Sequence, residues 1–154
     1  MFKTLSLLSL FFMISFYAAG QEKLSEAEIV GTWNITAIDM GEGLYMDLQN
    51  DSIHVADSLK KNWKTKEDST IALGMLKMLS EPMKQFVITI YPKGTFEAHM
   101  GPKGDTGSYV ITDNKVELKL KSKSDVLVGT RENELMKFDS GKGKKRLVMY
   151  FHRQ

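Results

Sequence analysis

The 154-residue sequence contains no cysteine, only three prolines and three histidines, and almost no excess of charge of one sign. Without cysteine the chain can form no disulfide bond and has no thiol nucleophile. With 21 Lys and Arg against 19 Asp and Glu, the formal net charge is only +2, which gives no reason to expect a nucleic-acid partner. The hydrophobic fraction of 42% is ordinary for a globular protein, and the length suits one core.

One long apolar run is present, at the N-terminus. It follows Lys3, covers residues 5–16 with only serines interrupting it, and ends near Ala18-Ala19-Gly20, whose small residues suit a cleavage site. We predict a signal peptide, residues 1–20, cleaved after Gly20; an uncleaved anchor is the alternative, although the run is short for a membrane span. Residue 21 is Gln, so no lipidated cysteine follows the cleavage site.

The mature chain, residues 21–154, is expected to be one soluble domain without a stable membrane anchor. Loss of Lys3 leaves 20 basic against 19 acidic residues, a net charge of +1. Export without cysteine favours a bacterial periplasm or exterior, because small secreted eukaryotic domains usually depend on disulfides.

From Phe86 onward the sequence consists of period-two runs separated by turn residues. The clearest run, residues 115–121, places Val116, Leu118 and Leu120 on one face and charged residues on the other. Similar runs are expected to be strands, with tight turns between them, at residues 86–91, 95–100, 107–112, 126–130, 134–139 and 146–153. Short connections predict an up-and-down antiparallel β-barrel, which closes with about eight strands.

The N-terminal part of the mature chain predicts a helical turn followed by strands. Residues 25–28 fit a capping box, and Leu24 is placed to pack on Ile29. A strand is expected over residues 29–38 with Trp33 on its buried face, followed by a turn and a short strand over residues 44–48.

Residues 54–85 break the pattern of strands and predict a helical insert. Helices are expected at residues 57–63 and 69–80, the second ended by Pro82. On the second helix a narrow polar stripe is expected, formed by Thr70, Gly74, Lys77, Glu81 and Lys84. Because nearly all its other residues are apolar, this helix is expected to bury most of its circumference against protein, ligand or lipid.

Gly31-Thr32-Trp33 near the mature start resembles the Gly-x-Trp signature of the first strand, strand A, of lipocalins. Residues 92–96, 107–118 and 147–153 are similar to the small exported lipocalin-like proteins of bacteria. The resemblance implies that Trp33 lies at the closed end of the barrel, with a basic residue of the last strand packed across it, Arg153 first and Arg146 second. The chain departs from lipocalins in the connection between strands A and B, which is a lid loop at the open mouth in lipocalins and is here enlarged into the helical insert of residues 54–85.

The resemblance implies that the barrel binds a small hydrophobic molecule. The Met-rich face of residues 71–79 would then be a lid; it could instead plug the barrel and fill its core, or contact a partner or a membrane. We predict the ligand-lining residues Met75, Met78, Tyr91, Phe96, Met100 and Tyr109. The alternative is a structural or protein-interaction module whose barrel is filled by its own side chains and which displays the insert to an exported partner.

No residue pattern indicates catalysis, a metal or a cofactor. His54, His99 and His152 are far apart in sequence, and the acids between residues 39 and 51 lack the spacing of a calcium loop. The glycines at 101–107 are not followed by a phosphate-loop lysine, and Ser108 is not in a nucleophile elbow. The basic residues 142–146 are expected to form a solvated hairpin tip. We therefore expect a binding protein with no enzymatic activity.

Overall fold

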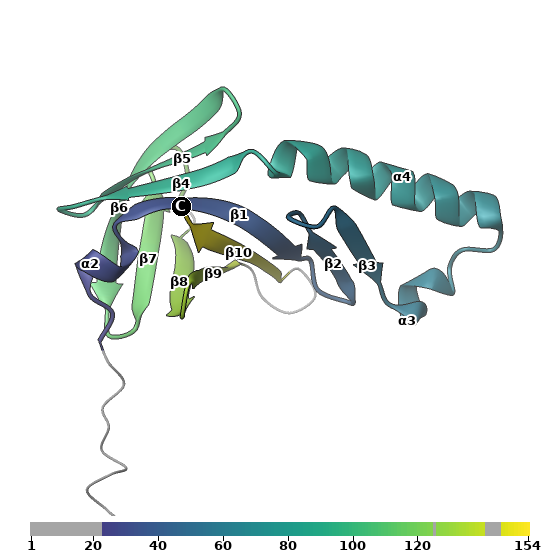
Figure 1. Cartoon of the computed structure of the whole chain (residues 1–154), viewed down its shortest axis with the longest axis horizontal. Helices are drawn as coiled ribbons and strands as arrows, with labels where there is room; N and C mark the ends of the chain where they lie inside the picture. The colour runs from purple at the N-terminus through teal and green to yellow at the C-terminus, as the bar shows by residue number, and fades with distance from the viewer. Residues whose placement is uncertain (1–22, 125, 141–145) are drawn as a thin grey trace, which may run out of the picture.

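The computed structural model describes residues 23–124, 126–140 and 146–154. The predicted signal peptide and residues 142–145 of the basic cluster lie outside these residues. The described strands form one antiparallel sheet in the order β10-β9-β8-β7-β6-β5-β4-β1-β2-β3 (Figure 1). Their bounds are β1 Gly31–Asp39, β2 Leu44–Asp47, β3 Ser52–Val55, β4 Phe86–Tyr91, β5 Thr95–Met100, β6 Lys103–Thr112, β7 Lys115–Leu120, β8 Val126–Glu132, β9 Leu135–Ser140 and β10 Leu147–Arg153.

Eight strands, β1 and β4 to β10, close into an up-and-down barrel because β10 also pairs with β1. This closure confirms the predicted barrel. One edge of β1 pairs with β10 along most of its length, while the other edge pairs first with β4, from Gly31 to Asn34, and then with β2, from Ala37 to Asp39. A register shift between Ile35 and Ala37 marks a bulge, so Ile38 is buried although strict alternation along the strand would place it on the opposite face from Trp33.

The barrel interior is filled by the protein's own side chains. Rings stack edge to face inside it, with Phe151 at 5.6 Å from Phe138 and 5.5 Å from Phe86 between centroids. The largest fully buried side chains are Trp33, Phe96, Phe138, Phe151, Ile29, Ile88, Ile90, Leu118, Met136 and Val116. A Cβ atom added at Gly129 would lie 2.5 Å from Phe138, so even a methyl group finds no free space beside that ring.

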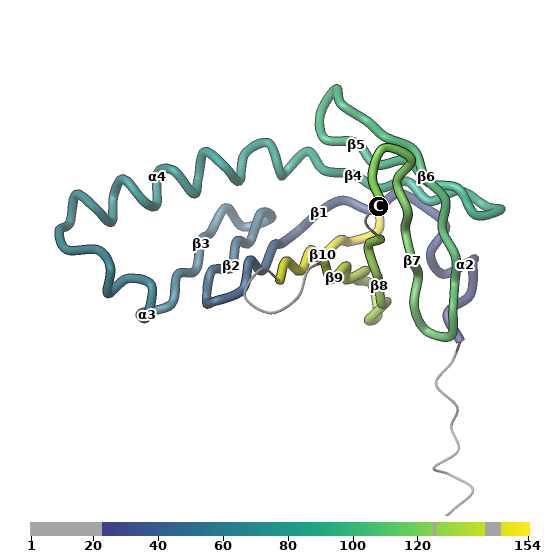
Figure 2. Tube along the Cα trace, turned by 180° about the vertical axis from the view of Figure 1, so that it is seen from behind, coloured from purple at the N-terminus to yellow at the C-terminus, as the bar shows by residue number. Residues whose placement is uncertain are grey.

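The insert between β1 and β4 consists of the β2–β3 hairpin followed by α3 (Asp57–Lys60) and α4 (Lys66–Met83). Figures 1 and 2 show the insert projecting from one side of the barrel, with α4 running beside the hairpin. Ala72, Leu76 and Ser80 form the less exposed face of α4, and α4 contacts β3. Lys77 and Lys84 also bind Asp51 at the hairpin turn, at 3.3 and 2.8 Å.

Three predictions about the insert were wrong. Residues 52–55 form strand β3, so the insert predicted to be helical from residue 54 begins with the end of a strand. Ile53 and Val55 alternate with polar neighbours, and the strand pairs with β2. Helix α4 begins at Lys66, because Thr65 and Asp68 form a capping box, and it continues past Pro82 to Met83. Pro82 does not end the helix since it lies in the last turn, where it removes only one hydrogen bond.

The helical turn at the N-terminus is α2 (Glu26–Ile29), with the predicted Ser25–Glu28 capping box. It is joined to the barrel by a hydrogen bond from the Leu24 amide to the Asp113 carbonyl, 2.9 Å long. Leu24 and Ile29 both belong to the hydrophobic core. The segment therefore covers the end of the barrel near the β6–β7 turn.

Candidate functional site

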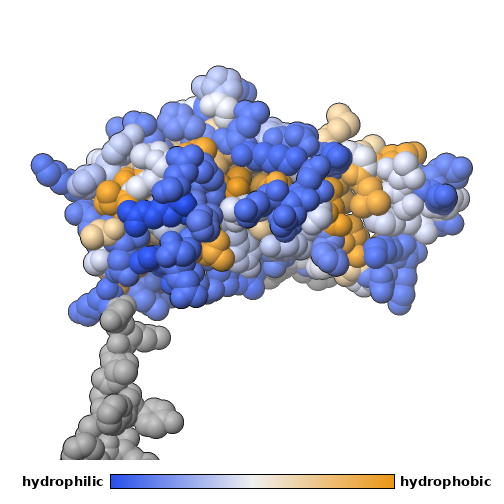
Figure 3. Space-filling model, viewed as in Figure 1, coloured by the Kyte–Doolittle hydropathy of each residue, from blue (hydrophilic) through white to orange (hydrophobic). Residues whose placement is uncertain are grey.

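One face of α4 exposes four large apolar side chains. The exposed fractions are 57% for Ile71, 61% for Met75, 77% for Met78 and 58% for Leu79. Their spacings of four, three and one place them together on the helix surface. We call these four residues the α4 apolar face. In Figure 3 hydrophobic side chains gather at the end of the molecule formed by α4 and the hairpin.

The chain itself buries only one sector of α4, so the predicted burial of most of the circumference against protein, ligand or lipid would need something outside the chain. The helix has three sectors: one packed towards the hairpin through Ala72 and Leu76, one with the predicted polar stripe, and one with the α4 apolar face. The stripe itself is present, since Thr70, Gly74, Lys77 and Glu81 are exposed. The sequence showed which residues are apolar but not that the small hairpin covers only one of the two apolar sectors.

The turn between α3 and α4 concentrates positive charge around an aromatic side chain. Lysines occupy positions 60, 61, 64 and 66, and the partly exposed Trp63 lies among them. Lys60 pairs with Asp57 at 3.2 Å, whereas Lys61, Lys64 and Lys66 form no ion pair with any described residue. We call residues 60–66 the lysine-rich tip. This cluster was not predicted as a site from the sequence, although four lysines in seven residues are a visible signal.

Gly31, Trp33 and Arg153 lie together at one end of the barrel. The Trp33 indole Nε1 donates a 2.8 Å hydrogen bond to the Ile29 carbonyl, and the Arg153 guanidinium lies 5.8 Å from the Trp33 ring centroid. Arg153 also donates to the Val30 carbonyl. A Cβ atom at Gly31 would be 2.9 Å from Arg153 Nε, so glycine makes room for this packing. Arg146, the second candidate, instead pairs with Asp139 at 2.6 Å.

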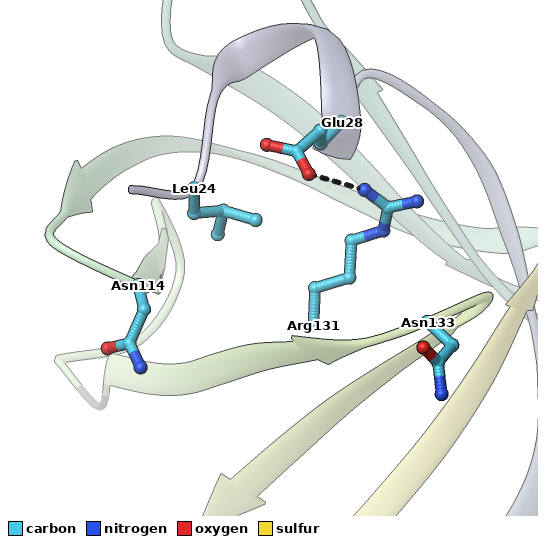
Figure 4. A pocket seen from close by; sticks show the side chains of 5 residues that line it. All are labelled: Leu24, Glu28, Asn114, Arg131 and Asn133. Atoms are coloured by element: carbon cyan, nitrogen blue, oxygen red, sulfur yellow. Dashed lines mark hydrogen bonds and ion pairs between the residues drawn. The ribbon is translucent and has the colours of Figure 1, made fainter. Parts of the chain in front are cut away.

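A cavity of about 310 Å³ lies between α2 and the turns at the same end of the barrel (Figure 4). Its lining residues are Leu24, Glu28, Asn114, Arg131 and Asn133. Glu28 Oε1 accepts a 2.7 Å hydrogen bond from Arg131, and hydrogen bonds from the Ser25 amide and hydroxyl, with Arg131, lower the pKa of Glu28. Arg131 Nε is buried and has no hydrogen-bond partner among the described residues. The two charges neutralise each other, and a carboxyl with a lowered pKa is a poor general acid.

The six predicted ligand-lining residues are not brought together. Met75 and Met78 lie on α4, away from the barrel interior, and Met100 is 40% exposed at the end of β5. Tyr91 and Phe96 line a groove of about 250 Å³ whose other walls include exposed polar side chains, namely Thr95, Thr106, Ser108 and Lys121. This groove opens on the outside of the barrel.

Tyr109 is buried and bonded rather than free to meet a ligand. Its hydroxyl is 2.6 Å from Glu26 Oε1 and 3.0 Å from the Tyr91 carbonyl. Burial, then the hydrogen bond to Glu26, raises the pKa of Tyr109, and the same bond lowers the pKa of Glu26. Its role here is to fix α2 against the barrel.

The described residues include no group of three His, Asp or Glu side chains placed to hold a metal ion. His54 and His152 are exposed on β3 and β10, and His99 Nε2 lies 3.4 Å from Glu97. Over the part of the chain that the structure describes, no helix has both the length and the apolar character to cross a membrane.

Comparison with known proteins gives one similar structure. No family model matches the chain, and no curated protein matches it. The chain is similar to the crystal structure of a DUF4847 family protein from Bacteroides vulgatus ATCC 8482, with 14% identity and a TM-score of 0.49. The match covers 84% of this chain and 98% of that chain. None of these comparisons points to lipocalins, so that resemblance stays a prediction, while the barrel itself rests on the strand pairing.

Proposed function

We propose that this chain is an exported interaction module: the barrel is a scaffold, and the insert binds a partner surface outside the chain through the α4 apolar face. The observation that supports this most is the exposure of Ile71, Met75, Met78 and Leu79 on one side of a single helix. Soluble monomers rarely leave large contiguous apolar patches uncovered, and such patches commonly mark binding surfaces. Methionine suits such a surface because its flexible side chain adapts to different partners.

The packing of the barrel favours this proposal over transport of a ligand. Trp33, Phe138 and Phe151 are each 0% exposed, and their rings occupy the space that a guest would need. For α4 to act as a lid it would have to leave the hairpin, break the Asp51 ion pairs and cross to the barrel end. A small hydrophobic ligand under a Met-rich lid is therefore the second candidate, supported by the family resemblance alone.

Site-specific photocrosslinking in producing cells tests the proposal. A photoreactive residue is placed at position 78 on α4 or, as the matched control, at position 110 on β6, where Val110 is also an apolar residue and is 61% exposed. We expect a discrete adduct from position 78 and none from position 110. Equal labelling at both positions, or no adduct to either protein or lipid from position 78, would contradict an interaction through α4.

Native mass spectrometry of the protein purified from its producer tests the second candidate. We expect the mass of the bare polypeptide, because the interior is filled. An apolar molecule that co-purifies in equal amount and is retained by the Met75→Glu/Met78→Glu variant would place ligand binding in the barrel instead.

A further inference from the structure

We infer that the surface bound by α4 is an anionic phospholipid membrane, on which the helix lies flat with the lysine-rich tip anchoring its N-terminal end. This inference rests on the proposed function and names the partner of the same face. It joins two observations on adjacent segments, the α4 apolar face and the unpaired lysines around Trp63.

The apolar sector of α4 has the composition of an interfacial helix. Such helices lie in the membrane plane, with the apolar side at the boundary of headgroups and acyl chains and the polar side in water. The α4 apolar face contains two Met, one Leu and one Ile, and the exposed Pro82 extends it by one further turn. The polar stripe, with Lys77 and Glu81, borders this sector.

The charge of the tip complements an anionic surface. The nearby acids are engaged locally: Asp57 pairs with Lys60, and the Asp68 carboxylate accepts hydrogen bonds from the Lys64 and Thr65 amides at 3.0 Å. Glu67 adds one further negative charge. Lys61, Lys64 and Lys66 therefore remain available for lipid phosphates. A tryptophan among lysines is typical of side chains that settle at the headgroup level.

The shape of the molecule permits this contact. Figures 1 and 2 show α3 and the start of α4 at the end of the molecule farthest from the barrel. The tip and the α4 apolar face thus belong to a projecting arm.

Charge argues against a second copy of the chain as the occupant. In a parallel pair of α4 helices the two lysine-rich tips would meet and repel. In an antiparallel pair the tip would face the region of Lys77 and Lys84 of the other copy. The acids in that region, Asp51 and Glu81, already bind these two lysines. Among the described residues, a parallel pair offers each tip only Glu67 of the other copy, one carboxylate against three unpaired lysines, and an antiparallel pair offers it no free carboxylate.

Vesicle co-sedimentation tests the inference, using the exported chain without residues 1–20, whose apolar run would itself enter lipid. Vesicles are made of phosphatidylcholine alone or of phosphatidylcholine with phosphatidylglycerol. We expect binding to the mixed vesicles and much weaker binding to the neutral ones. Of the two tryptophans, Trp33 is fully buried, so a blue shift of fluorescence on binding reports Trp63, and the Trp63→Phe variant should lose it.

Three variants separate the contributions. Met75→Glu/Met78→Glu should abolish vesicle binding, while the matched Val110→Glu on the barrel should leave it unchanged. Lys61→Gln/Lys64→Gln/Lys66→Gln should reduce binding to the mixed vesicles roughly a hundred-fold, since each lysine near an anionic surface contributes about five-fold. All these side chains are exposed, so circular dichroism should show an unchanged fold.

The outcomes distinguish this inference from the proposed function. The anionic-lipid inference would be overturned if the protein bound neither vesicle type. It would also be overturned if the protein bound both types equally and the triple lysine variant bound as well as the wild type. A protein adduct from position 78 under those conditions would retain the interaction module with a protein partner. A dimer in sedimentation velocity that Met78→Glu dissociates, without vesicle binding, would assign the face to a second copy and overturn the inference.

Discussion

The barrel and the insert use apolar side chains in opposite ways. In the barrel, Phe96, Phe138 and Phe151 are at most 2% exposed, and the first strand pairs with the last. In the insert, two short strands and two helices cover only part of one another, and Met78 is 77% exposed. The barrel buries its apolar side chains within itself, whereas the insert leaves a large part of its apolar side chains exposed to solvent.

This difference indicates which region determines stability and which is available for binding. Burial of apolar area stabilises a fold, and an exposed apolar side chain contributes little until something covers it. Local opening also requires less free energy where few apolar contacts are broken. We therefore expect the barrel to govern global unfolding and the insert to respond to partners.

The largest expected contrast is between truncations in the two regions. Phe151→Ala should lower the free energy of unfolding by about 3–5 kcal/mol, because it removes a fully buried ring and leaves a cavity. Met78→Ala should change it by no more than about 0.5 kcal/mol, because that side chain is mostly in water. Urea denaturation of both variants measures this. A loss of more than 2 kcal/mol for Met78→Ala would show that α4 is covered in the free protein, and the comparison would fail.

The sequence predicted the barrel well because each strand carries its own signal. Residues 115–120 alternate strictly, and the observed strand β7 buries Val116 and Leu118 and exposes the charged residues between them. Turn residues confirmed the hairpins: Asp113 and Lys93 adopt positive φ in the β6–β7 and β4–β5 turns. The pairing of β1 with β10 could be predicted only from the number of strands and the family resemblance.

The insert was predicted less well because its structure depends on what lies beside each segment. Helical periodicity marks Leu76 and Met78 alike as apolar, yet Leu76 faces the protein and Met78 faces solvent. Strand β3 is only four residues long, too short for alternation to be distinctive. The sequence could thus predict which residues of α4 are apolar but not which of them are exposed. No local pattern shows how much of a helix is covered by its neighbours.

A second contrast compares glycines in the two regions. At Gly107 in β6 an added Cβ would lie 2.3 Å from the Lys119 carbonyl oxygen and 2.4 Å from the Phe96 ring, so Gly107→Ala should lower the free energy of unfolding by about 1–3 kcal/mol. At Gly74 in α4 a Cβ would meet nothing within 4 Å. Gly74→Ala should therefore stabilise the helix by about 0.5–1 kcal/mol. Thermal unfolding followed by circular dichroism shows whether each variant is more or less stable than the wild type. A destabilising Gly74→Ala would mean that other atoms cover the side of α4 on which Gly74 lies.

The smallest expected effect concerns the contact between α4 and the hairpin. Asp51 in the β2–β3 turn binds Lys84 at 2.8 Å and Lys77 at 3.3 Å, and these hydrogen bonds, with Lys84 first, lower the pKa of Asp51 below its ordinary value of 3.8. A carboxyl with a lowered pKa stabilises the folded arrangement above its unfolded pKa and loses this contribution as the pH falls through the folded value. Acidification below about pH 4 should therefore loosen α4 from the hairpin.

Asp51→Asn should have the same effect at neutral pH, because asparagine tolerates the φ of 53° at this turn and removes only the charge. Asp113→Asn is the matched control, since Asp113 also has positive φ in a hairpin turn but lies on the barrel. Hydrogen exchange should show faster exchange of the α4 amides in Asp51→Asn, and unchanged exchange in the barrel strands of both variants. Exposed ion pairs contribute little to global stability, so the midpoint of unfolding should hardly move. If α4 amides exchanged at the wild-type rate in Asp51→Asn, the apolar contacts of Ala72 and Leu76 would suffice to hold the helix. The insert would then be held by apolar packing, as the barrel is, and not by its ion pairs.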